Sequence, residues 1–519
     1  MRTTGGRRAQ GRIEWVSVTV GSGVARGRAK SRVAVFPVAW PLAAVSSALA
    51  AVFVPLALLR SIDGDEGSYL LAAKLVGEGE LPYRDFVYPQ MPLLPYVYAG
   101  WSALTTEGWY AARLLSALLA VGLGVSLYAY AARRFGPRLA LLGTALYASS
   151  SLVFGWLTVV KTYALSTLLL FAAYALVTRE RPGRLAWAAA GIALGLAIDT
   201  RLLFAAAVPA FAWAGWHAGR RAAAMLAAGL LAGLVPALVF LAADPDRFLW
   251  DNLEAQGTRS SSGLVGDVPQ KARVAANLLG FGDTDGVVGP QFLLLAIAAG
   301  AATFAVLLLR RRLPLSLAIA FLLGGASLLP TPTYPQYFCV TVPFLAVSLL
   351  ELLERVRPGD RELRIALTGL LACGVGAYVL LAAIDVHRYA RGSRPLDARI
   401  ATVERVASVV QANTRTGERV LASWPGYLFG THARPYPGLE NDFSPRNAST
   451  ISPEEAHRYR LATIADVERA IRARRTRLVV FRLWQTLPPQ PDWQGALRAG
   501  RYRLLERVGT ASVYVRSGA

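Results

Sequence analysis

The chain has 519 residues, of which 54% are hydrophobic and only 17% are charged, and its mean hydropathy is +0.39. Soluble globular proteins carry about 25% charged residues, so this composition excludes an ordinary soluble protein. The formal net charge of +22 comes from basic residues spread over many segments without a nucleic-acid recognition motif, so we expect membrane lipids rather than nucleic acid as the anionic partner.

Long uncharged runs begin after a basic tail, residues 1–32, which we expect to be disordered and cytoplasmic. About 20 apolar residues suffice for a helix to cross a hydrocarbon core about 30 Å thick. The runs therefore predict an α-helical polytopic membrane body at 33–385 with about eleven transmembrane helices. We expect these spans at 33–59, 113–132, 139–159, 161–178, 185–198, 202–218, 222–243, 287–309, 314–330, 337–353 and 365–385.

The short loops between the predicted spans alternate in charge. With the basic tail placed inside, every second loop is rich in arginine, as cytoplasmic loops are, and the intervening loops carry more acids. Two long loops, 60–112 and 244–286, then lie outside, and an odd number of crossings puts residues 386–519 outside as well. The pattern predicts a multi-pass membrane protein with a cytoplasmic N-terminus.

Two segments of the first outer loop have helical character. "EGSYLLAAKLVGEG" predicts an amphipathic helix lying along the membrane surface. "PLLPYVYAGWSAL" is too short to span comfortably and predicts an interfacial helix with tyrosine and tryptophan at headgroup level.

The region 386–519 alternates between helical and strand patterns. "LDARIATVERVASVVQANTRTG" and "DVERAIRARR" predict helices, whereas "RVLASW" and "RLVVFR" predict buried strands. A terminal strand pair is expected around Gly509 and Thr510. This order predicts a small extracytoplasmic α/β domain.

Acidic residues follow the first predicted span, where water meets hydrocarbon. A carboxylate held there is partly desolvated, which raises its pKa and makes it a stronger base. Asp65 or Glu66 could therefore take a proton from a hydroxyl group as it attacks an electrophile. The same acids could instead mark the non-cytoplasmic side and cap a surface helix.

Basic residues stand where predicted spans begin on the outer side. Lys161 and Arg201 each open a span that runs inwards, and a helix N-terminus attracts anions. Arg259 in the second outer loop could add a third cation to a phosphate site. The alternative is that the first two side chains only extend to the membrane interface.

The interiors of the predicted spans contain no acidic or basic side chain. Ion-coupled transporters usually need such groups near the membrane midplane, so an enzyme acting at the outer face is favoured over a pump. No HExxH, CxxC or Walker sequence is present, and the histidines are scattered, so the sequence predicts no metal site.

The first outer loop resembles that of bacterial GT-C glycosyltransferases, which include protein O-mannosyltransferases and lipid A aminoarabinose transferase. The resemblance rests on the acid pair Asp65–Glu66 and on "GELPYRDFVYPQMPLLPY", Gly79 to Tyr96. It implies a polyprenyl-phosphate-linked sugar donor and a hydroxyl acceptor on a glycan, lipid or protein. Transfer would take place at the bacterial plasma membrane and would invert the configuration at the anomeric carbon of the sugar, with Asp65 as general base.

The resemblance also implies a substrate pocket, and one residue departs from the family pattern. The pocket residues would be Asp63, Tyr83, Arg84, Asp85 and Tyr163. Many relatives have an acid where this chain has Lys161, and some use it to hold a divalent metal. A charged lysine cannot ligate a metal, so a divalent metal cofactor stays open but doubtful, and Lys161 could instead bind the lipid phosphate directly. A lipid or glycan transporter and a non-catalytic scaffold remain alternatives.

Overall fold

The computed structural model describes residues 39–257, 267–279, 291–292, 295–298, 300–301, 313–355, 361–391, 399–482 and 492–518. The predicted tail at 1–32, Arg259 and most of the predicted span at 287–309 lie outside the described residues. Pro41–Ala519 form one compact unit, which contains both the helical body and the C-terminal domain.

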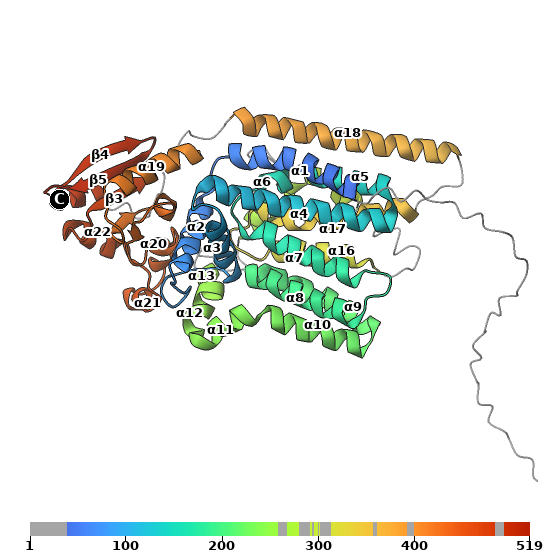
Figure 1. The fold of residues 1–519 in the computed structure, drawn as a ribbon, viewed down its shortest axis with the longest axis horizontal. Helices are drawn as coiled ribbons and strands as arrows, with labels where there is room; N and C mark the ends of the chain where they lie inside the picture. Colours follow the sequence, from blue (N-terminus) through green and yellow to red (C-terminus); the bar gives the residue numbers. More distant parts are fainter. Residues whose placement is uncertain are drawn as a thin grey trace, which may run out of the picture. The chain divides into compact units, whose positions relative to one another are not determined.

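The described part of the membrane body is built from helices, many of which pack side by side (Figure 1). In chain order they are α1 (Ala39–Leu59), α2 (Gly64–Gly77), α3 (Leu93–Leu104), α4 (Trp109–Phe135), α5 (Pro137–Ala148), α6 (Ser151–Trp156), α7 (Thr162–Val177), α8 (Arg184–Thr200), η1 (Leu202–Ala207), α9 (Val208–Ala218), α10 (Arg220–Gly233), α11 (Val235–Ala243), α12 (Pro245–Leu249), η2 (Trp250–Glu254), α13 (Ala255–Gly257), α14 (Val268–Leu278), α16 (Leu315–Ser327), η3 (Pro335–Thr341), α17 (Val342–Arg355) and α18 (Arg361–Arg391).

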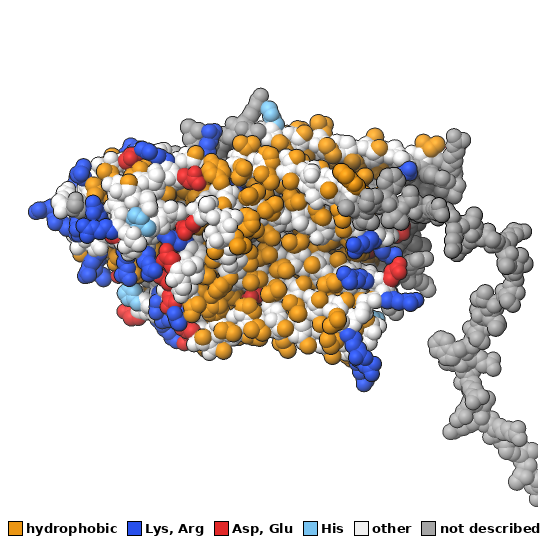
Figure 2. All heavy atoms as spheres, viewed as in Figure 1, with side chains coloured by type: hydrophobic (Ala, Val, Ile, Leu, Met, Phe, Trp, Pro, Cys, Tyr) orange, Lys and Arg blue, Asp and Glu red, His pale blue; other side chains and the backbone are white. Residues whose placement is uncertain are grey.

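Among the described residues, four helical segments are long and apolar enough to cross a membrane: Trp40–Leu59, Trp109–Phe135, Pro335–Glu354 and Thr368–His387. Hydrophobic side chains form a band over the helical body, and lysine and arginine gather beyond both of its edges (Figure 2). The protein is thus a multi-pass membrane protein. The larger number of spans expected from the sequence stays a prediction.

Two predicted spans are broken rather than continuous. α10 and α11 meet at an angle of 54°, next to Pro236, because proline removes a backbone donor and clashes with the preceding turn. The predicted span 139–159 is wrong as one helix, since α5 ends at Ala148 and α6 begins at Ser151. The hydroxyl and backbone N–H of Ser151 bond to Gln291 instead of continuing the helix, at 2.8 and 2.7 Å.

Both helices predicted in the first outer loop are confirmed, but α2 does not lie on the surface. Every residue from Glu66 to Leu75 is buried, and the C-terminal domain covers this helix. The Lys74 ammonium, for example, donates to the carbonyl oxygens of Leu428, Thr431 and Ala433 at 2.5–3.2 Å. The amphipathic pattern predicted the helix correctly but could not reveal that a domain packs on its polar side.

The C-terminal domain is a small α/β unit, as predicted. Its five-stranded sheet has the order β2-β1-β3-β5-β4, with β1 parallel to β2 and β3 and the other neighbours antiparallel. The elements are α19 (Ile400–Ala412), β1 (Arg419–Ala422), η5 (Pro425–Leu428), β2 (Arg434–Pro435), α20 (Ser444–Ala448), α21 (Pro453–Arg458), α22 (Ile464–Arg472), β3 (Leu478–Arg482), α23 (Trp493–Ala499), β4 (Tyr502–Val508) and β5 (Ala511–Arg516).

A close contact between α2 and the C-terminal domain depends on a glycine. The Trp424 indole N–H donates to the Gly64 carbonyl oxygen at 2.7 Å, and a Cβ at Gly67 would lie 2.6 Å from the Trp424 ring and 2.7 Å from the Gly426 backbone nitrogen. Gly67→Ala should therefore lower the free energy of unfolding by about 1–3 kcal/mol. Thermal unfolding in detergent checks this, with Gly100→Ala in α3 as control because nothing lies within 4 Å of its Cβ position. Equal stability of the two variants would contradict the close contact.

Candidate active site

The site is built around the N-terminus of α2, which follows the first apolar helix directly. Asp63 caps the helix by accepting from the Asp65 backbone N–H at 3.2 Å, and Glu66 accepts from the Asp63 backbone N–H at 2.7 Å. This reciprocal capping box is a local sequence effect, because it needs only acidic residues three positions apart. The capping box fixes the first turn of α2, which carries the Asp65 side chain.

Glu66 is buried and its carboxylate is bonded on several sides. It forms a fully buried ion pair with Arg113 of α4, with Nε–Oε2 and Nη2–Oε1 distances of 2.5 and 2.7 Å. It also accepts from the Val160 backbone N–H at 2.9 Å. Arg113 in turn donates to carbonyl oxygens at the end of α1, including that of Ala57 at 2.6 Å. These contacts join α1, α2, α4 and the segment before α7.

Lys161 connects the two aspartates. Its ammonium lies 2.8 Å from Asp63 Oδ1 and 2.9 Å from Asp65 Oδ2, at the N-cap of α7. Lys161 thus compensates one of the two carboxylates, and the nearby Arg60 adds a second positive charge that acts on Asp63. The Asp63 side chain is 17% exposed and that of Asp65 is 37% exposed, which makes Asp65 the carboxylate accessible to a substrate.

The environment of Asp63 favours its ionised form. Burial acts to raise its pKa, but the charge of Lys161 and its hydrogen bond, with further help from Arg60, hold the pKa below the usual aspartate value. Asp63 is therefore a fixed negative charge that orients Lys161 and caps α2.

Arg201 lies on the other side of the site, between α8 and η1. It donates to the Thr162 hydroxyl at 3.1 Å, and its guanidinium group stacks over the rings of Tyr163 and Tyr337 at 4.7 and 5.2 Å from their centres. These aromatic faces hold a cation away from bulk water without neutralising it. The charge remains available to an anion.

Asp65 and Arg201 border the same small pocket, of about 60 Å³. Its lining combines aromatic rings with polar groups from the first outer loop, the membrane helices and the C-terminal domain. The residues are Asp65, Ser68, Tyr69, Tyr88, Pro89, Gln90, Tyr163, Arg201, Gln256, Pro330, Tyr337, Asn441 and Phe443.

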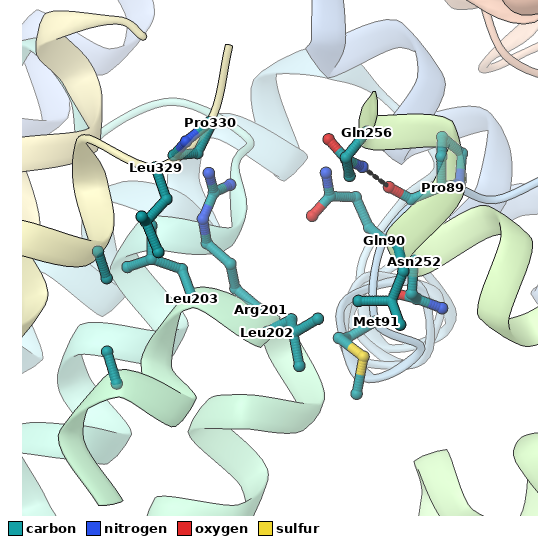
Figure 3. Close-up of a pocket in the computed structure, with 13 residues that line it drawn as sticks. Pro89, Gln90, Met91, Arg201, Leu202, Leu203, Asn252, Gln256, Leu329 and Pro330 are labelled. Carbon is teal, nitrogen blue, oxygen red and sulfur yellow. Dashed lines mark hydrogen bonds between the residues drawn. The ribbon is translucent and has the colours of Figure 1, made fainter. Parts of the chain in front are cut away.

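A larger and mostly apolar cavity of about 500 Å³ adjoins this pocket. Figure 3 shows the Arg201 side chain extending between Leu329 and Pro330 on one side and Gln90 and Gln256 on the other. Arg201 borders both spaces. An amphiphilic ligand could thus place an apolar chain in the large cavity and an anionic head beside Arg201.

Four residues that the resemblance implied for the pocket do not line it: Asp63, which caps α2 and pairs with Lys161, and three residues of the loop that follows α2. Tyr83 is buried under Phe240 and Phe248, and its hydroxyl donates to the Gln90 carbonyl oxygen at 2.6 Å. Arg84 is exposed and pairs with Asp85 at 2.8 Å. Asp85 also accepts from the Leu81 backbone N–H at 2.8 Å. These three shape the loop that carries Gln90, whereas Asp65, Tyr163 and Arg201 do meet in the pocket as expected.

Sequence reasoning missed two groups of residues. The first is Arg113, which stands in the second turn of an apolar helix. A charged side chain in contact with lipid is costly, so its presence there could have indicated a buried ion pair. The second group, Asn441 to Phe443, carries no comparable signal, because a loop of the C-terminal domain reaches the pocket only through tertiary packing.

The charged groups around Asp65 do not fit a divalent metal. The position between Asp63 and Asp65 is taken by the Lys161 ammonium, which supplies the positive charge that a metal would bring. Among the described residues, no three histidine, cysteine, aspartate or glutamate side chains come together in an arrangement that could hold a metal.

The helical body, the outer-loop helices and the covering α/β domain define a GT-C fold. The crystal structure of ArnT from Cupriavidus metallidurans bound to undecaprenyl phosphate matches with a TM-score of 0.62 at 13% identity, covering 92% of this chain and 98% of that one. The apo structure of ArnT gives 0.64 at 14% identity with the same coverage. The oligosaccharyltransferase of Archaeoglobus fulgidus, in complex with Zn and sulfate, gives 0.52 at 14% identity, covering 91% of this chain and 73% of that one.

Sequence comparison agrees with the fold. Residues 89–243 match the family model described as dolichyl-phosphate-mannose-protein mannosyltransferase. Among curated proteins, none is similar enough in sequence to match. The family model covers less than a third of the chain and the shared fold extends over about nine tenths of it, so the comparisons relate this chain to GT-C membrane glycosyltransferases.

Proposed function

We propose that this protein transfers a sugar from a polyprenyl-phosphate donor to a hydroxyl acceptor on the outer face of the plasma membrane, with inversion and with Asp65 as general base. One observation carries the proposal: a partly exposed carboxylate and a cation on aromatic faces border one pocket that adjoins a large apolar cavity. That is the arrangement required by a donor with a lipid chain, a phosphate and a sugar. The likeness to ArnT, whose structure contains undecaprenyl phosphate, supports the same choice of donor.

In this mechanism the donor phosphate lies beside Arg201 and its polyprenyl chain occupies the apolar cavity. The phosphate gains charge as the bond to the sugar breaks, and a preorganised cation stabilises that charge. On the far side of the sugar, Asp65 accepts the proton of the attacking hydroxyl group.

Lys161 takes a different part from the one first expected. It is bonded to both Asp63 and Asp65, and it is not among the residues that line the two cavities. We therefore assign the phosphate to Arg201 and give Lys161 the positioning of Asp65. Glu66 likewise becomes a positioning residue, because its carboxylate is buried against Arg113 and lies away from the pocket.

The central test is transfer of a labelled sugar from a synthetic polyprenyl-phosphate donor by the purified protein, to water or to an added acceptor. A transporter or a scaffold would release no sugar from the donor. Retention of the label on the polyprenyl phosphate in all conditions, together with flux of the intact glycolipid across proteoliposomes, would replace the enzyme proposal with transport.

Arg201→Ala should weaken binding of polyprenyl phosphate about 10- to 100-fold, because a hydrogen bond to a charged group contributes about 1.5–3 kcal/mol. Arg201→Lys should lie between the wild type and the alanine variant, since it keeps the charge but loses the planar donor fork. Titration with the lipid in detergent measures the affinity. Arg134→Ala, an exposed arginine in the last turn of α4, is the matched control. If Arg201→Ala binds polyprenyl phosphate as tightly as the wild type, the assignment of the phosphate to Arg201 is wrong.

A further inference from the structure

The C-terminal domain reaches into the catalytic pocket at one place. Asn441 and Phe443 line that pocket together with Asp65, and neither residue borders the apolar cavity. Arg201 and Gln90, by contrast, border both spaces. The pocket therefore has a lipid side, where it adjoins the cavity, and a side formed by the C-terminal domain.

The segment 441–443 is held in place by specific hydrogen bonds. Ser68, one turn after Asp65 on α2, donates its hydroxyl to Asp442 at 2.7 Å across the domain boundary. Within the segment, the Asn441 side-chain oxygen accepts from the Phe443 backbone N–H at 2.9 Å. Asn441 and Phe443 thus have fixed positions relative to Asp65, which a binding wall requires.

The same segment places a further carboxyl group near the proposed base. Burial and the carboxylates of Asp65 and Asp63 raise the pKa of Asp442 to about 7, against the opposing hydrogen bond from Ser68. A further anion is poorly accommodated on this side of the pocket, whereas neutral hydroxyl groups can donate to carboxylate oxygens.

We infer that the segment 441–443 forms the acceptor side of the active site and that the acceptor hydroxyl group belongs to a sugar ring. The chemistry of the wall matches such a ligand. The Phe443 ring offers an apolar face to ring C–H groups, and the Asn441 amide NH₂ can donate to a hydroxyl oxygen. Asp442 acts as a positioning residue through Ser68. This inference rests on the proposed transfer reaction and adds the class of acceptor and the residues that select it.

The experiment separates the acceptor from the donor by using water as the reference acceptor. Full-length protein receives a labelled polyprenyl-phosphate sugar, and two rates are measured: release of free sugar by hydrolysis, and transfer to a panel of alkyl glycosides. We expect Phe443→Ala and Asn441→Ala to raise the KM for the alkyl glycoside about tenfold or more, the loss of one or two such contacts. Hydrolysis and donor affinity should stay near the wild-type values.

Asp442→Ala tests the positioning role. It removes the acceptor of the Ser68 hydroxyl, so it should raise the acceptor KM by a similar factor to Ser68→Ala, and the double variant should show no further increase, because both changes break the same bond. Glu468→Ala on α22, which is a comparable loss of a carboxylate away from the pocket, is the control and should match the wild type.

Each failure has its own signature. If the variants weaken donor binding or hydrolysis while the acceptor KM is unchanged, the segment belongs to the donor side and the inference is wrong. If the wild-type protein hydrolyses the donor but uses a serine-containing peptide and no alkyl glycoside, the acceptor class is wrong. Absence of both hydrolysis and transfer in the wild type would instead refute the proposed function itself.

Discussion

Asp65→Asn should lower the rate of sugar transfer by about 10²- to 10⁴-fold, the usual contribution of a general base. The asparagine is nearly isosteric and can still accept from Lys161, but it cannot take a proton. Because Asp65 is not the group that we assign to the phosphate, affinity for polyprenyl phosphate should change little. Transfer kinetics and lipid titration on the same preparation measure the two effects.

Asp85→Asn provides the matched control for that experiment. Asp85 is on the same outer loop, but it pairs with exposed Arg84 and accepts from the Leu81 backbone N–H instead of lining the pocket. Its transfer rate should stay within a few-fold of the wild-type rate. If both variants lose activity equally, the effect comes from the loop as a whole, and the assignment of Asp65 as general base is wrong.

Arg113→Ala should destabilise the protein by about 3–5 kcal/mol, since it leaves the Glu66 carboxylate buried without its charge partner. The change also removes donors to the backbone carbonyl oxygens at the end of α1. Unfolding of the purified protein in detergent, followed by circular dichroism, measures the loss.

Replacing both partners discriminates the ion pair from simple loss of volume. Arg113→Met combined with Glu66→Gln removes both charges and should be less destabilising than Arg113→Ala alone. A double variant that is less stable than the single one would show that the side chains contribute mainly through other contacts. Activity of the double variant then reports how far Glu66 serves only to position Asp65.

The membrane body could be predicted because hydrocarbon imposes one dominant rule. Each crossing segment must be long, apolar and helical, so α1, α4 and α18 are visible as uncharged runs in the sequence. The rule fails inside the protein, where the backbone N–H and C=O groups at a helix break can form hydrogen bonds with neighbouring side chains. Ser151 does this through Gln291, and no run of apolar residues could show it.

The candidate site was only half predictable. Asp65, Lys161 and Arg201 became candidates because each stands at one end of an apolar run, where a charged residue is conspicuous; the structure brings Asp65 and Arg201 to one pocket and bonds Lys161 to Asp65. The resemblance assigned Tyr83, Arg84 and Asp85 to the pocket. In the structure their side chains instead bond within the loop that carries Gln90.

The sequence by itself determined that the chain is a helical membrane protein with an acidic loop after its first apolar helix and a C-terminal α/β domain, because these properties follow from local composition and periodicity. Tertiary structure alone decided which charges meet. Lys161 pairs with Asp65 across 96 residues of chain, and Ser68 bonds to Asp442 across 374. Such contacts depend on how helices and domains pack against each other, and no short stretch of sequence encodes that arrangement.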